Sequence, residues 1–419
     1  MSCGAAHGGD RAFRDGIYRV AWWLAALTLA CSSTDPGLEQ ASEGSATPAG
    51  LLAVPPLVGR PTADSVTLNL VAGPSPVDLE LRLEPPGSGE LSLTLEAEEA
   101  RDVVLDGLAA GSEYRYTIAV RGEDQTTGAR SENLSGRFVT QRPPGAEFTF
   151  AVLTDTHQPV PPPEWLDRRT TELFLPEIYD YLASRVDIGD VIRRTMRSIQ
   201  EREVDFIVCL GDMFHFFRGF NDPFPTATTA EYAYLDLRAH FGQATAEAAF
   251  FAAVGNWEGE SGWHPDTLRS HAQQARLKYL LNPEGSPNED YFAWSWGDAL
   301  FVVLNVSTYT PTRHIMDPED DGTATDWTLG DTQRAWLEAT LRTSDAPIKL
   351  LFIHHAVGGH GGDEPNSAYG RGGGRAARVG EQARIHQLML EHGVQIFFYG
   401  HDHVFTDQIV DGIHYTLPG

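Results

Sequence analysis

The stretch VQIFFYGHDH (394–403) places two histidines and an aspartate directly after a run of apolar residues. Four other stretches have the same form: FTFAVLTDTH (148–157), DFIVCLGD (205–212), AFFAAVGNWE (249–258) and IKLLFIHH (348–355). Short apolar runs bounded by polar residues predict buried β-strands. Polar residues at the carboxyl ends of buried strands form the usual rim of an active site in an α/β sheet. We therefore expect these five polar blocks to form one site.

The side chains at the ends of these runs are of the kinds that bind metal ions. Together they offer carboxylates, one amide oxygen and several imidazoles. A mixed oxygen and nitrogen set of this kind suits borderline transition-metal ions. The blocks therefore predict two metal ions held side by side.

The order and residue types of the five blocks resemble the calcineurin-like metallophosphoesterase superfamily, over residues 147–419. A single DxH or GHxH block occurs by chance, whereas five in order, each at the end of a strand, are specific. The resemblance implies an α/β fold, a four-layer αββα sandwich. It also implies hydrolysis of phosphoric esters, as a phosphatase or a phosphodiesterase, by a metal-activated hydroxide. The expected substrate is a small phosphate ester.

The same resemblance assigns the metal ligands. Asp212 is the candidate for the carboxylate that bridges both ions, which are expected to be divalent or trivalent Fe, Mn or Zn. The first ion is completed by Asp155, His157 and His403, and the second by Asn256, His354 and His401. Asp212 and Asn256 are therefore also candidate catalytic residues.

His354, His355 and Glu258 each have two possible roles. Successive residues of a strand point to opposite faces, so only one of His354 and His355 is expected to ligate directly. The family pattern favours His354 and leaves His355 as a catalytic group that orients a ligand or faces the substrate. Glu258 either orients ligands or backbone through hydrogen bonds or is a solvated loop carboxylate.

Two positions depart from relatives of this kind. Relatives usually carry histidine after the asparagine of the third block, where this chain has Trp257. We expect Trp257 to contact the substrate, and the departure keeps open a binding module that retains metals without useful turnover. Purple acid phosphatases have a tyrosine ligand three residues after the bridging aspartate, where this chain has His215, so a coloured iron–tyrosinate centre is not expected.

A glycine-rich segment, residues 358–380, separates the fourth block from the following helix. It contains Arg371 and Arg375, which are candidate contacts for a substrate phosphate because a guanidinium binds phosphate with two parallel hydrogen bonds. The alternative is an excursion of the surface without a functional role.

The N-terminal residues are typical of an export signal. Three arginines precede an apolar stretch at 20–30 that is too short to span a bilayer, and Cys31 follows at once. This resembles a bacterial lipoprotein signal, with a signal peptide at 1–30, a lipidated Cys31 and a flexible polar linker at 31–52. We therefore expect an exported protein of the bacterial cell envelope, held on the membrane by lipid in the periplasm or at the cell surface.

Residues 53–142 contain short β-rich runs that alternate with turn residues, which predicts a small all-β sandwich ahead of the catalytic domain. The segment GLAAGSEYRY (107–116) resembles a fibronectin type III strand pair, and purple acid phosphatases carry a comparable domain. No reactive cluster lies in it. The formal net charge of −27 argues against nucleic acid as a partner, because binding the phosphate backbone requires a basic surface.

Overall fold

The computed structural model describes residues 50–86, 89–123, 131–160, 176–216, 227–262, 264–306, 328–355 and 375–419. The expected signal peptide, Cys31, almost all of the expected linker and Arg371 lie outside these residues. Within them, no helix is both long enough and apolar enough to cross a membrane.

The N-terminal part is an antiparallel sandwich of two sheets. One sheet has the order β1 (Leu57–Gly59), β2 (Val66–Val71), β5 (Ala100–Leu105); the other has the order β4 (Leu91–Leu95), β3 (Val77–Glu84), β6 (Glu113–Gly122), β7 (Ser131–Val139). In β6 buried and outward residues alternate, and the phenol of Tyr114 accepts a hydrogen bond from the backbone N–H of Ala109 at 2.8 Å. A tyrosine that closes on the backbone a few residues upstream is a hallmark of immunoglobulin-like sandwiches. The predicted fibronectin type III-like sandwich is confirmed.

The following part contains two facing sheets. The first is parallel, in the order β12 (Ala249–Ala252), β10 (Phe206–Cys209), β8 (Phe150–Leu153). The second is mixed, in the order β13 (Phe292–Trp296), β14 (Ala299–Val303), β15 (Ile348–Phe352), β16 (Ile396–Phe398), β18 (Ile413–Pro418), β17 (Phe405–Val410). A short parallel pair, β9 (Gln158–Val160) and β11 (Phe214–Phe216), lies beyond the ends of β8 and β10.

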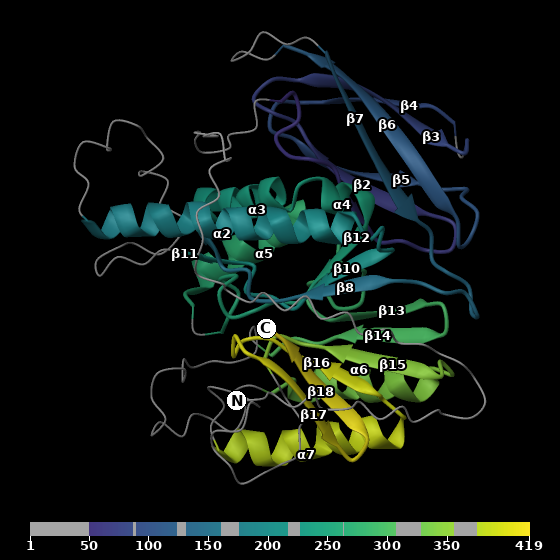
Figure 1. The fold of residues 1–419 in the computed structure, drawn as a ribbon, viewed down its shortest axis with the longest axis vertical. Helices are drawn as coiled ribbons and strands as arrows, with labels where there is room; N and C mark the ends of the chain where they lie inside the picture. Colours follow the sequence, from purple (N-terminus) through teal and green to yellow (C-terminus); the bar gives the residue numbers. More distant parts are fainter. Residues whose placement is uncertain are drawn as a thin grey trace, which may run out of the picture. The chain divides into compact units, whose positions relative to one another are not determined.

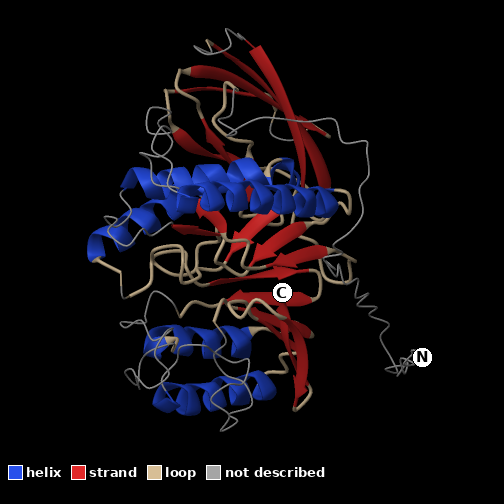
Figure 2. Ribbon diagram, turned by 60° about the vertical axis from the view of Figure 1, so that its left-hand side comes forward, coloured by secondary structure: helices blue, strands red, loops and turns tan. Residues whose placement is uncertain are grey.

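Helices cover the outer face of each sheet (Figures 1 and 2). The first sheet packs against the layer of α2 (Pro176–Gln200), α3 (Ala227–Phe241), α4 (Gln243–Glu247) and α5 (Asp266–Tyr279). The second sheet packs against α6 (Gly330–Thr343) and α7 (Arg375–Glu391). The predicted four-layer αββα sandwich is therefore confirmed.

Strand β10 shows why the predicted strands are apolar on both sides. Phe206 and Val208 face the second sheet, where Phe206 meets Phe301 edge-to-face with ring centroids 5.1 Å apart, whereas Ile207 and Cys209 face the helices. A strand buried on both faces needs an uninterrupted apolar run. Burial raises the pKa of the Cys209 thiol, as expected for a cysteine that serves packing.

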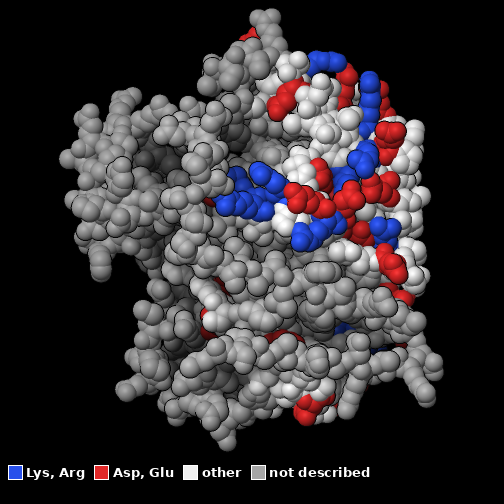
Figure 3. Space-filling model, in the orientation of Figure 1, with Lys and Arg blue, Asp and Glu red and all other residues white. Residues whose placement is uncertain are grey.

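The surface of the β-sandwich carries charges of both signs close together. Figure 3 shows basic and acidic side chains interspersed over the face that it draws. Several form exposed ion pairs, such as Arg121 with Glu80 at 2.7 Å and Arg82 with Glu90 at 2.8 Å. Pairs this exposed contribute little to stability.

Candidate metal centre

The five polar blocks meet at the carboxyl ends of the two sheets. Asp155, Asp212 and Asn256 follow β8, β10 and β12, which run parallel to one another. The histidine blocks follow β15 and β16, which are also parallel. The two edges are joined by contacts such as the backbone N–H of His401 to Oδ2 of Asp155 at 2.9 Å and Nδ1 of His354 to the carbonyl oxygen of Leu210 at 3.0 Å. The fold thus brings all seven candidate ligands together.

The backbone of this site has an unusual conformation. Five candidate ligands have positive φ angles: Asp155 (52°), His157 (45°), Asp212 (48°), His401 (76°) and His403 (52°). Residues other than glycine seldom adopt this region, and such residues cluster at functional sites. Aspartate and histidine adopt this region more readily than most residues, but their presence in a sequence does not locate it, because most of them have negative φ angles.

Glycines allow the loops to approach the ligands closely. A Cβ atom on Gly255 would lie 2.3 Å from Oδ1 of Asp212, and one on Gly400 would lie 2.2 Å from Oγ1 of Thr154 and 2.8 Å from Oδ2 of Asp155. Neither distance leaves room for a side chain.

The first ligand group is Asp155, His157 and His403. The Nε2 atoms of His157 and His403 are 2.9 Å apart and lie 3.6 and 3.2 Å from Oδ1 of Asp155. The other oxygen, Oδ2, accepts the backbone N–H of His401 at 2.9 Å, which fixes the carboxylate. The His403 side chain is 56% exposed, so this half of the site opens to solvent.

The second ligand group is Asn256, His354 and His401, and it lies deeper. The amide Oδ1 of Asn256 is 3.1 Å from Nε2 of His354, 2.9 Å from Nδ1 of His401 and 3.2 Å from Oδ2 of Asp212. Nδ1 of His354 lies 3.0 Å from the carbonyl oxygen of Leu210, which turns Nε2 toward the site. Because the amide oxygen faces all three of these atoms, a cation bound among them would be held by that oxygen.

Asp212 lies between the two groups. Its Oδ2 is 3.0 Å from Nε2 of His354 and 3.8 Å from Nε2 of His157, and its Oδ1 accepts the backbone N–H of Trp257 at 2.8 Å. A carboxylate oxygen that faces imidazoles of both groups is suited to bridge two ions. The convergent oxygen and nitrogen atoms therefore fit a pair of transition metals.

The electrostatics of the site also favour cations. Burial lowers the pKa of His354, but the charges of Asp212 and Asp155 outweigh burial, and the pKa rises to about 9. Burial would raise the pKa of Asp155, but the charge on His354 and hydrogen bonds from His157 and His403 hold it well below its usual value. Burial and the charge on His354 lower the pKa of His401 to about 3. A protonated His354 compensates the buried carboxylates, and a bound cation would take over this role.

The expectation that His354 and His355 point to opposite faces of a strand is wrong. Strand β15 ends at Phe352, so both histidines lie beyond it and the alternation of a strand no longer applies. The His355 ring lies 3.9 Å from the His401 ring and 4.8 Å from that of His354, measured between centroids. His355 is buried, and burial lowers its pKa well below the usual value. This position is suited to orienting His401.

Glu258 is buried and joins two ligand loops. Its Oε1 accepts the backbone N–H of Met213 at 2.7 Å, and its Oε2 accepts that of Gly255 at 2.7 Å. Glu258 is therefore an orienting carboxylate and not a solvated loop residue, and the groups that it orients are backbone N–H groups. Burial, and then the charge of Asp212, raise its pKa to about 8.

Of the three expected substrate contacts, Trp257, Arg371 and Arg375, the structure describes the side chain of Trp257 alone. Trp257 lies at the rim of the site, with its indole edge-on to His157 at 6.3 Å between centroids. Arg375 is the first residue of α7, but its side chain, like all of Arg371, lies outside the described residues. The side chain of His215 also lies outside them.

The model of the calcineurin-like phosphoesterase family matches residues 148–405, and the chain belongs to this family. By structure, it is similar to PhoD, at 17% identity over 88% of this chain and 74% of PhoD, with a TM-score of 0.59. It is also similar to the purple acid phosphatase PPD1 from yellow lupin seeds (Lupinus luteus), at 14% identity over 84% of this chain, with a TM-score of 0.55. The chain spans 59% of the lupin protein. At these identities the structural likeness shows the fold alone, and no curated protein matches by sequence.

Proposed function

We propose that this protein hydrolyses phosphoric esters with two transition-metal ions, Fe, Mn or Zn, bound at this site. The observation that carries the proposal is the convergence of six donor side chains on the two sides of Asp212. When bound, such ions supply an activated nucleophile from water and neutralise the charge of the phosphoryl oxygens. This is the chemistry that phosphate esters require, because their anionic oxygens repel nucleophiles.

The protein residues have separate roles in this proposal. Asp155, His157 and His403 would hold the first ion at the solvent side, where the exposed His403 leaves the site open to a substrate. Asn256, His354 and His401 hold the second ion, and Asp212 is shared. The neutral amide of Asn256 leaves the second ion more electron-poor than a carboxylate would, which favours polarisation of the ester.

Trp257 gives the proposal its substrate preference. The indole offers an aromatic wall to an aryl or nucleoside group, but its N–H is only a hydrogen-bond donor and does not protonate a leaving oxygen at neutral pH. We therefore expect esters with acidic leaving groups to be cleaved best. Arg371 and Arg375 remain candidate phosphate contacts.

The test uses the full chain reconstituted with Mn or Zn and assayed against aryl monoesters, aryl diesters and nucleotides. Turnover that requires metal and is lost in Asp212→Asn supports the hydrolase. The second candidate, a metal-dependent binding module, is favoured by the presence of Trp257. Tight binding of phosphate esters without turnover, with the metals in place, would favour the module.

We also propose that the protein is exported and held on the bacterial membrane through lipidated Cys31. The apolar stretch at 20–30 and the cysteine directly after it support this. In a bacterial host, the Cys31→Ser variant should move to the soluble periplasmic or culture fraction. Identical partitioning of variant and parent would contradict the lipid anchor.

A further inference from the structure

The loop that carries Asn256 and Trp257 is anchored by a buried ion pair. Glu260, in the same loop, accepts two hydrogen bonds from Arg276 of α5, at 2.6 and 3.1 Å. Both side chains are only 1% exposed. Two parallel bonds between a guanidinium and a carboxylate fix both partners in orientation as well as in distance.

The remaining donors of Arg276 bind a second segment. Its Nη2 donates to the carbonyl oxygen of Asn288 at 2.8 Å, and its Nη1 donates to that of Glu289 at 3.0 Å. The position of the Arg276 guanidinium therefore depends on the backbone of residues 282–290. The position of the Asn256 loop depends in turn on Arg276, through Glu260.

The same segment also holds strand β12, which leads into Asn256. The side chain of Asn282 accepts the backbone N–H of Ala252 at 2.9 Å and donates to its carbonyl oxygen at 2.8 Å. Because β12 is an edge strand, this side chain takes the place of a neighbouring strand. Asn282 also donates to the carbonyl oxygen of Glu289 at 3.1 Å, which ties both ends of the segment together.

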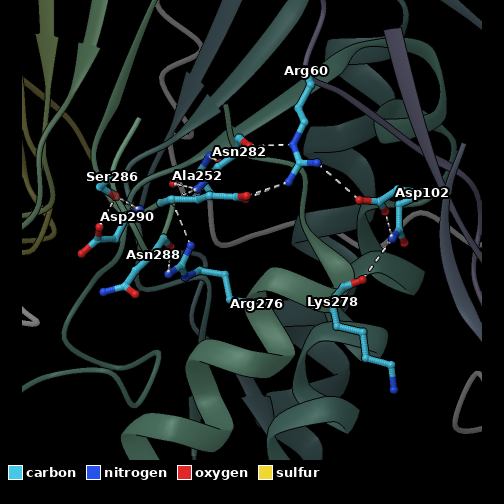
Figure 4. A network of polar contacts seen from close by, with 11 residues as sticks. Arg60, Asp102, Ala252, Arg276, Lys278, Asn282, Ser286, Asn288 and Asp290 are labelled. Carbon is cyan, nitrogen blue, oxygen red and sulfur yellow. Dashed lines mark hydrogen bonds and ion pairs between the residues drawn. The ribbon is translucent and has the colours of Figure 1, made fainter. Parts of the chain in front are cut away.

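An arginine of the β-sandwich holds this segment from outside (Figure 4). Arg60, directly after β1, donates to the carbonyl oxygen of Asn282 at 2.9 Å and to both carboxylate oxygens of Glu289 at 2.9 Å. Asp102 of β5 lies 3.4 Å from the same guanidinium. The Arg60 side chain is 25% exposed and that of Glu289 is 19% exposed.

The contact between the β-sandwich and residues 278–290 depends on close packing as well as on charge. A Cβ atom on Gly59 would lie 2.3 Å from Cβ of Leu281, so β1 packs directly against the residue before Asn282. Asn69 of β2 donates to the carbonyl oxygen of Lys278 at 3.0 Å, at the end of α5. The sandwich therefore holds both α5 and the segment that follows it.

We propose that the β-sandwich positions Asn256 of the second ligand group, and that Arg60 is the positioning residue through which it does so. The connection runs from Arg60 to Glu289 and Asn282, then to Arg276, and from Arg276 through Glu260 to the Asn256 loop. The proposal rests on the proposed function, since it concerns the affinity of the second ion. The first ligand group lies on other loops, and the shared ligand Asp212 connects it to the Asn256 loop by accepting the backbone N–H of Trp257 at 2.8 Å.

The experiment measures the binding of each ion to the full chain in two variants, Arg60→Met and Glu289→Gln. Methionine replaces the aliphatic part of the arginine side chain and removes its guanidinium. The matched control is Arg121→Met, which removes an ion pair of the same sandwich that does not contact the catalytic domain. Readouts are Zn²⁺ titration calorimetry and the visible absorption spectrum of the Co²⁺-loaded protein. Residues behind metal ligands change metal affinity about 10–100-fold. Because Arg60 acts on Asn256 through intervening residues, we expect the second ion to bind more weakly by up to about 10-fold in Arg60→Met, the lower end of this range, and the first ion to be weakened less.

The outcomes separate this proposal from a merely structural contact. A lower unfolding temperature with both affinities unchanged, or with both reduced equally, would overturn it. If Arg60→Met does not fold, Glu289→Gln decides, since it keeps the shape of the side chain and weakens the contact. A parent chain that binds fewer than two ions would overturn the proposed function, whereas two ions unaffected by either variant would overturn only this positioning role.

Discussion

Asp212 is the side chain on which the site depends most, because one of its oxygens faces imidazoles of both ligand groups. Oδ1 of Asp155 lies nearest to the imidazoles of the first group, 3.2 Å from Nε2 of His403 and 3.6 Å from Nε2 of His157. The two carboxylates are similar in type and burial, so their different positions can be tested directly.

We expect Asp212→Asn to lose both ions and Asp155→Asn to lose mainly the first. Activity should fall by more than about 100-fold in Asp212→Asn, since even residues behind a ligand cost 10–100-fold. Elemental analysis after reconstitution gives the metal content, and aryl phosphate hydrolysis gives the activity. Two retained ions in Asp212→Asn would contradict the bridging role.

Trp257 gives a second prediction at the scale of the residue. General acid assistance is typically worth about 10²–10⁴-fold, and an indole does not supply it. Plotted against the pKa of the leaving group, rates should fall steeply in the parent and less steeply in Trp257→His. A shallow slope that is the same in both proteins would point to an acid elsewhere.

At the scale of elements, the site is a set of loops held at fixed distances by buried polar groups. Glu258 ties the loop after β10 to the loop after β12 by accepting the backbone N–H groups of Met213 and Gly255. The loops follow parallel strands, so a small change in one loop alters the distance between ligands that belong to different strands.

We expect Glu258→Gln to lower the free energy of unfolding by about 1–3 kcal/mol, because one buried N–H then faces an amide nitrogen and not an oxygen. Urea unfolding measures the change. The control is Glu338→Gln, which alters an exposed pair with Arg384 and should cost less than about 1 kcal/mol. Equal losses of unfolding free energy in the two variants would show that the buried hydrogen bonds of Glu258 contribute no more to stability than the exposed ion pair does.

At the scale of the whole molecule, the β-sandwich and the phosphoesterase-family domain share buried polar contacts. Arg238 of α3 is 1% exposed, and its guanidinium donates to the side chain of Asn69 and to the carbonyl oxygen of Pro55 at 2.7 Å. Tyr116 of β6 donates to the carbonyl oxygen of Ala246 at 2.9 Å. Removing these acceptors while the domains stay packed would leave a buried cation with fewer partners, which is costly.

Metal removal should lower the stability of the molecule, because ions bind the folded site and compensate its buried carboxylates. A ligand at 100 times its dissociation constant stabilises the folded state by about 2.7 kcal/mol. We expect a higher unfolding temperature with Mn²⁺ or Zn²⁺ than with a chelator, and no such difference in Asp212→Asn. Equal temperatures for the parent in both conditions would contradict a preformed site.

Local sequence determined the strands, the chemical identity of the ligands and the two-domain layout. The reason is that each block combines an apolar run, which must be buried, with polar residues at its end. Tertiary structure alone decided the rest: the convergence of His354 and His355, the backbone partners of Glu258 and the contacts of Arg60. These depend on residues far apart in the chain, such as Arg60 and Glu289, which are separated by 229 positions. Such contacts arise from how the layers pack, and no local pattern of residues encodes them.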